Sequence, residues 1–111
     1  MKYDISLIIE ASAKVIGIDG WWVDNVYYYG NNANVWNPLE SNTDAFQLQC
    51  DLGLSVDIQL DIETTAVLGG WLNGRHLPLA MVAECHNGDA AKATRLAISK
   101  AALELWDKRH G

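Results

Sequence analysis

The chain has 111 residues, of which half are hydrophobic and 20% are charged. This balance is typical of a folded domain and not of a disordered segment, so we expect residues 1–111 to form a single domain. No apolar stretch approaches the roughly 20 residues of a membrane span. The N-terminal residues also lack the apolar core and cleavage site of a signal peptide. We therefore expect a cytoplasmic protein that makes no contact with membranes.

The net charge is −6 at pH 7, because 14 Asp and Glu residues outnumber eight Lys and Arg residues. General binding to nucleic acid needs a basic face for the phosphates, and this charge argues against it. An acidic surface suits a basic protein partner instead. The two cysteines, Cys50 and Cys85, are too few for a disulfide scaffold, and we expect both to be small buried hydrophobic residues.

The first half of the chain predicts a helix followed by a short hairpin. Apolar residues recur at helical spacing over residues 4–17, with Asp4 as the N-terminal cap and Gly17 at the left-handed position that ends the helix. Residues 20–29 are aromatic and β-branched, which favours strands. The central pair of this segment, Asp24-Asn25, tolerates the positive φ angles of a tight turn.

Two further helices are predicted downstream. The second spans residues 43–52, with Ser41 or Thr43 as its cap and Gly53 as its end. The third spans residues 89–109 and begins at its cap, Asp89. It carries a stripe of alanines that would let the helix pack closely on a sheet.

Between these helices, Asn73-Gly74 is the strongest hairpin signal in the chain. We expect a long hairpin with arms at about residues 56–72 and 75–85. A two-residue turn pairs Leu68 with Leu79. The same register aligns one apolar face, contributed by Ala66, Leu68, Met81, Ala83 and Cys85 and extended by Val56, Ile58 and Leu60.

The opposite face of this hairpin would then carry the acidic residues at its base. Glu63 falls opposite Glu84, and Asp61 falls opposite His86. Such carboxylates either bind a metal or do acid–base work, or they are solvated and reach Lys or Arg, and we favour the second reading. The predicted fold is α+β with the order α-ββ-α-ββ-α, an antiparallel sheet packed by helices in an αβα sandwich-like arrangement.

Two segments resemble a known family. The segment WNPL at residues 36–39, followed by DAFQL at residues 44–48, is similar to the signature of the phage ABA-sandwich domain family. The segment ATRLAISKAA at residues 93–102 resembles the closing helix of that family. The resemblance implies a sheet sandwiched by helices, a phage or prophage origin, and action in the cytoplasm of a host cell. It implies no activity, and the aromatic residues 21–29 depart from the family pattern.

Aromatic residues are the first candidates for a binding site. Successive residues of a strand point to opposite faces, so if Trp22 packs inward, Trp21 points outward and Tyr28 lies on a different face from its neighbours. One aromatic face can join the core, while the other needs a helix, a flat ligand or a partner chain as its cover. Trp36 either plugs the core before the second helix or forms the wall of a ligand site.

Three cations could meet an anionic ligand. Arg75 and His76 adjoin Trp71 at the tip of the long hairpin, and Arg95 lies inside the third helix. A planar guanidinium can bind a phosphate through two hydrogen bonds, although a surface arginine is more often simply solvated. The candidate ligand-binding residues are thus Trp21, Trp22, Tyr28, Trp36, Trp71, Arg75, His76 and Arg95.

The sequence contains no Gly-rich phosphate loop, nucleophile elbow, HExxH or CxxC motif, so we predict no catalytic residue, metal or cofactor. We expect a non-enzymatic homo-oligomer that binds and sequesters a small nucleotide-like ligand, such as a host immune signal. The alternative is an acidic inhibitor that binds a host defence protein.

Overall fold

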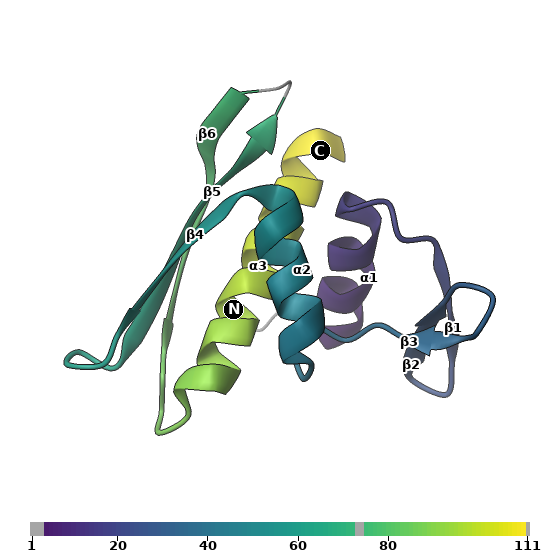
Figure 1. The fold of residues 1–111 in the computed structure, drawn as a ribbon, viewed down its shortest axis with the longest axis horizontal. Coiled ribbons are helices and arrows are strands. Elements are labelled where there is room, and N and C mark those ends of the chain that lie inside the picture. Colours follow the sequence, from purple (N-terminus) through teal and green to yellow (C-terminus); the bar gives the residue numbers. More distant parts are fainter. Residues whose placement is uncertain (1–3, 73–74, 111) are drawn as a thin grey trace.

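The computed structural model describes residues 4–72 and 75–110, with the backbone alone for residues 70–72, 75–79, 109 and 110. Within these residues, three helices and six strands follow the order α-βββ-α-βββ-α (Figure 1). The helices are α1 (Ile5–Val15), α2 (Asn42–Leu52) and α3 (Ala90–His110). Sheet A contains β1 (Gly20–Val23), β2 (Val26–Tyr29) and β3 (Asn34–Val35). Sheet B contains β4 (Leu54–Gln59), β5 (Thr64–Leu72) and β6 (Arg75–Cys85). The α+β class is confirmed, and both sheets are antiparallel.

The helices lie between the two sheets, and α3 is the central element (Figure 1). One side of α3 packs on sheet B and another packs on α1, while α2 runs beside α3 in the same direction. Sheet A, the smaller of the two, lies beyond α1 (Figure 1). Each layer therefore packs either on α3 or on a helix that contacts α3.

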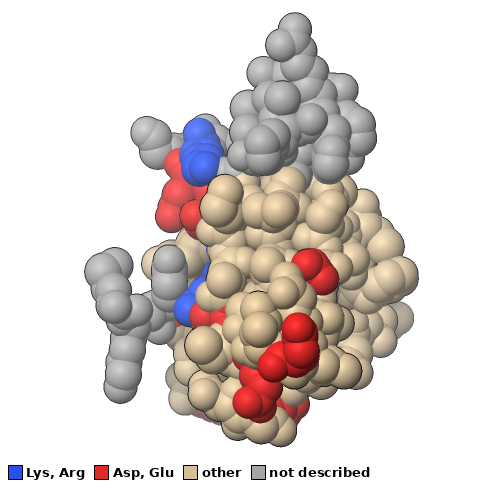
Figure 2. All heavy atoms as spheres, turned by 90° about the vertical axis from the view of Figure 1, so that its left-hand side faces the viewer, with Lys and Arg blue, Asp and Glu red and all other residues tan. Residues whose placement is uncertain are grey.

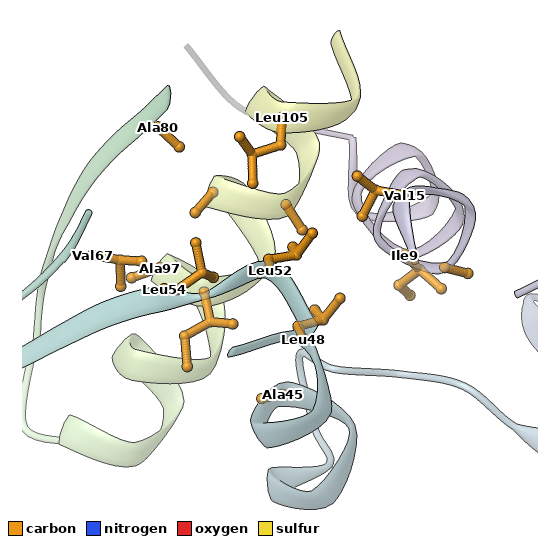
Figure 3. Close-up of a cluster of buried hydrophobic side chains, with 14 of the residues drawn as sticks. Ile9, Val15, Ala45, Leu48, Leu52, Leu54, Val67, Ala80, Ala97 and Leu105 are labelled. Carbon is orange, nitrogen blue, oxygen red and sulfur yellow. The ribbon is translucent and has the colours of Figure 1, made fainter. Parts of the chain in front are cut away.

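The core forms around α3 because this helix presents small residues to its neighbours. Ala97, Ala101 and Ala102 are fully buried, which allows a close approach of backbones on both sides. Larger side chains from the surrounding elements fill the remaining space and point toward α3 (Figure 3). They include Ile9, Val15, Leu48, Leu52, Leu54 and Val67.

The helix ends follow the predicted chemistry. The Asp4 carboxylate accepts a hydrogen bond from the Ser6 N–H at 2.9 Å, and Gly17 takes a φ of 83° after α1. The Ser41 hydroxyl accepts from the Asp44 N–H at 3.2 Å, and Gly53 ends α2 with a φ of 65°. At the start of α3, the Asp89 carboxylate accepts from the Lys92 N–H at 3.0 Å.

The predicted long hairpin is wrong in its first arm and in most of its register. A turn at residues 60–63, in which Glu63 adopts a φ of 48°, separates β4 from β5. The backbone pairs Leu72 with Arg75 as predicted, but an irregularity between Gly69 and Trp71 shifts the pairing beyond it. Leu68 therefore pairs with Met81 instead of Leu79. The predicted turn Asn73-Gly74 lies outside the described residues.

On β5 and β6, the inward and outward faces are also the reverse of the prediction, whereas Val56 of β4 packs against the core as expected. Leu68 and Met81, expected inside, are 41% and 75% exposed, whereas Val67 is fully buried against the helices. The cause is the turn at residues 60–63, which makes β4 pair with β5. This pairing puts Val56 beside Val67 and places the polar residues of β4 on the face that carries Leu68. The helices cover the face that carries Val56 and Val67, because β4, β5 and β6 all contribute apolar residues to it.

The structure also corrects the prediction for the two cysteines and the predicted neighbours of Glu84. Cys50 and Cys85 are both exposed, because Cys85 lies on the uncovered face of sheet B and Cys50 lies on the solvent side of α2. Glu84 faces Thr65 instead of Glu63, and Lys100 Nζ donates to its carboxylate at 2.9 Å and 3.2 Å. The pairing of Glu63 with Glu84 does not form, and Glu84 reaches a lysine, as the favoured interpretation expected.

We expect Ala97→Leu to lower the free energy of unfolding by about 1–3 kcal/mol, because the larger side chain overfills the contact between α3 and sheet B. Urea denaturation followed by circular dichroism measures the change. Lys92→Leu on the exposed side of the same helix is the control, and it should stay within about 0.5 kcal/mol of the parent. Equal effects of the two substitutions would contradict the central position of Ala97.

Candidate functional site

The aromatic hairpin of sheet A divides its rings between two faces, as the alternation predicted. Trp22 pairs with Tyr27, packs edge-on to it at 5.0 Å between ring centroids, and donates its indole N–H to Glu10 of α1 at 3.2 Å. Trp21 pairs with Tyr28 on the outer face, where the two rings stack at 6.3 Å. Trp21 remains 44% exposed, so the outer face offers aromatic surface to a partner.

Trp36 is a core residue. Its side chain is fully buried, and its indole N–H donates to the Ser12 hydroxyl at 3.0 Å. That hydroxyl in turn donates to the Ile9 carbonyl oxygen at 2.7 Å, so the polar atom of the indole is satisfied inside the core. The Trp36 ring has no surface that a ligand could contact.

Arg95 of α3 holds the chain that enters α2. Its Nε donates to the Leu39 carbonyl oxygen at 2.8 Å, and its Nη1 donates to Asn42 Oδ1 at 2.8 Å. These two bonds fix the plane and the position of the guanidinium, which is partly exposed. Arg95 is therefore a preorganised cation at the start of α2.

The same arginine lines a groove of about 440 Å³ between α2 and the N-terminal half of α3. Phe46 stands in the wall on the α2 side and is 63% exposed, and Ile58 of β4 contributes an apolar surface that is 50% exposed. The groove is mainly apolar with a few polar groups, as ligand sites commonly are. Its lining residues are Asn42, Ala45, Phe46, Gln49, Ile58, Ala90, Ala91, Thr94, Arg95 and Ile98.

The groove combines features that attract an anion with neighbouring carboxylates that oppose it. Asn42 and Ala90, the first residues of the two parallel helices, both line it, so two helix N-termini direct the positive ends of their dipoles there. The neighbouring carboxylates already accept backbone hydrogen bonds. Asp44 accepts from the Asn37 N–H at 2.9 Å, and Asp89 accepts from Lys92 at 3.0 Å.

A chain of buried polar groups supports one wall of the groove. The Thr94 hydroxyl, on the groove side of α3, lies 2.9 Å from the Thr65 hydroxyl. The Thr65 oxygen also lies 2.8 Å from Nε2 of His86, and both Thr65 and His86 are buried. These contacts fix the Thr94 side chain and join the groove to sheet B.

The structure does not gather the predicted ligand residues into one place. Arg95 lines the groove, whereas Trp21 and Tyr28 lie on sheet A. The side chains of Trp71, Arg75 and His76 lie outside the described residues. Sequence reasoning missed Phe46, although the helical pattern of α2 held the signal: this ring falls beside the buried stripe formed by Ala45, Leu48 and Leu52.

A second hollow of about 210 Å³ lies where β6 meets α3. Lys100 and Glu84 both line it, and they neutralise each other through the ion pair at 2.9 Å. Among the described residues, no group of three or more His, Cys, Asp or Glu side chains is placed to hold a metal ion. The larger groove is the stronger candidate for a ligand.

No family model, no curated protein and no solved structure matches the chain. None of the helices among the described residues combines the length and the hydrophobicity of a membrane-spanning segment. The case for a function therefore depends on the geometry of the groove and of the exposed surfaces.

The two neighbouring tryptophans of β1 should respond differently to truncation. Trp22→Ala removes a packed ring and its bond to Glu10, so we expect the free energy of unfolding to fall by about 2 kcal/mol or more. Trp21→Ala removes a ring from the outer face and should cost less than about 1 kcal/mol. Urea denaturation of both variants checks the assignment. A larger loss of unfolding free energy for Trp21→Ala than for Trp22→Ala would contradict the assignment of Trp22 to the packed face.

Proposed function

We propose that this chain is a non-enzymatic binding protein that holds a small, flat, anionic ligand of the nucleotide class in the groove between α2 and α3. One observation carries the proposal: the fixed guanidinium of Arg95 and the exposed ring of Phe46 line the same groove. The first group can bind a phosphate, and the second offers a stacking surface for a base.

The dimensions of the groove support this class of ligand. Its volume of about 440 Å³ lies in the lower part of the range typical of small-molecule sites. Stacking of a base on an aromatic ring contributes roughly 1–3 kcal/mol, and the contact is tolerant of the identity of the base. Because Arg95 is held by two hydrogen bonds before a ligand arrives, little side-chain entropy is lost on binding.

The resemblance to the phage ABA-sandwich domain family supports a more specific proposal about the ligand. A phage protein acts inside a host cell, and some host defences signal through modified nucleotides. We propose that the ligand is such a signal and that the protein sequesters it in the host cytoplasm. Sequestration needs tight binding and no chemistry.

A second candidate function is inhibition of a host defence protein by direct contact. The outer face of sheet A favours it, because Trp21, Val23 and Val35 are 44%, 48% and 54% exposed. Exposed aromatic and aliphatic side chains of this kind anchor protein interfaces. The net charge of −6 would suit a basic partner around that anchor.

Isothermal titration calorimetry against a panel of mononucleotides, cyclic dinucleotides and cyclic ADP-ribose isomers tests the first function. For the member that binds, we expect Phe46→Ala to weaken affinity about tenfold at low and high salt, because stacking is not screened. Arg95→Gln should weaken affinity as well, and its effect should shrink as added salt screens the phosphate. Leu60→Ala, at an exposed position outside the groove, should bind as the parent does.

The opposite result is equally specific. If no nucleotide of the panel gives heat, and a host protein is recovered by the parent but not by Trp21→Ala, the groove proposal is wrong and the inhibitor proposal replaces it. Circular dichroism of each variant verifies that the fold is retained.

A further inference from the structure

Sheet B leaves one face uncovered. The registers of β4, β5 and β6 place nine side chains on this face in three cross-strand rows. No residue of the nine is buried. The rows are Ser55, Leu68 and Met81; then Asp57, Ala66 and Ala83; then Gln59, Thr64 and Cys85. We call these nine residues the outer face of sheet B.

This face is almost free of charge. Figure 2 shows a broad uncharged surface there, with acidic groups toward its lower end. Asp57 is the single ionisable carboxylate among the nine, and the Gln59 side-chain amide donates to it at 2.8 Å. An uncharged strip with Leu68 and Met81 exposed is unusual on a chain whose net charge is −6.

We propose that a second copy of this chain covers the outer face of sheet B, so that two sheets pack face to face across a twofold axis. The charges favour this occupant. A basic partner would gain nothing from a face with one carboxylate, and an acidic or highly polar partner would leave Leu68 and Met81 facing polar groups. An identical neutral face avoids both penalties.

The shape of the face is self-complementary. The first row carries the large side chains of Leu68 and Met81, and the second carries the small Ala66 and Ala83. We place the twofold axis parallel to the rows, midway between the first row and the second. Rotation about this axis sets Leu68 of one copy over Ala66 of the other, and Met81 over Ala83. The same axis sets Asp57 over Ser55 and keeps the two carboxylates off each other, in an isologous contact.

This interface is separate from the proposed ligand site. The groove lies on the helix side of sheet B, where it is lined by α2, α3 and the inward residue Ile58 of β4. Loss of the dimer therefore leaves the groove intact, and loss of ligand binding leaves the dimer intact.

Sedimentation velocity of the purified chain from roughly 1 to 300 µM tests the proposal, and we expect a monomer–dimer equilibrium in this range. Met81→Glu introduces a charge into the packed face and should raise the dissociation constant at least tenfold. Val35→Glu, at an exposed position of sheet A, is the matched control and should dimerise like the parent. A parent chain that stays monomeric at the highest concentration, or equal dimerisation of both variants, overturns the proposal.

Discussion

The structure depends on the small-residue surface of α3. Ala97, Ala101 and Ala102 are fully buried, and they let sheet B approach from one side and α1 from another. Close contact between elements places many atoms within van der Waals range. The alanines therefore stabilise the fold mainly by letting neighbouring side chains pack closely, and less through burial of their own methyl groups. Leu54 and Val67 of sheet B and Ile9 of α1 are buried because α3 offers no bulk to hold them away (Figure 3).

The same property explains the groove. Where α3 is surrounded on several sides, its alanines produce a dense core, but its N-terminal turns have α2 beside them and leave space over Ala90 and Ala91. Two small residues next to the exposed ring of Phe46 make a hollow instead of a packed contact. Arg95 extends from α3 to Leu39 and Asn42 at the start of α2, so its guanidinium places a positive charge beside the hollow.

Local chemistry made much of the fold predictable, and the uncertain part was the pairing of distant residues. Asp24 and Asn25 take φ angles of 48° and 68°, as the turn prediction required, since short polar side chains tolerate this conformation. The turn at residues 60–63 has neither Gly nor Pro, and its left-handed residue is Glu63, so Asp61 alone marked the turn and the local signal between β4 and β5 was weak. For the site, residue type led to Trp36, which is core, and Phe46 was missed although its position on the helix beside the buried stripe marks it as an exposed ring.

Apolar alternation left both faces of sheet B plausible, and buried polar contacts explain why one of them faces the helices. Thr65 meets Thr94 at 2.9 Å and His86 at 2.8 Å from the inward side of β5. A slip of β5 by one residue would turn Thr65 to solvent and remove the partner of a buried imidazole, at a cost of about 1–3 kcal/mol for each unsatisfied group. It would also bury Leu68 against alanines that fit Val67. The contacts among Thr65, Thr94 and His86 thus stabilise the register that exposes Leu68 and Met81. The exposed apolar face is therefore a consequence of the polar contacts made on the buried side of the sheet.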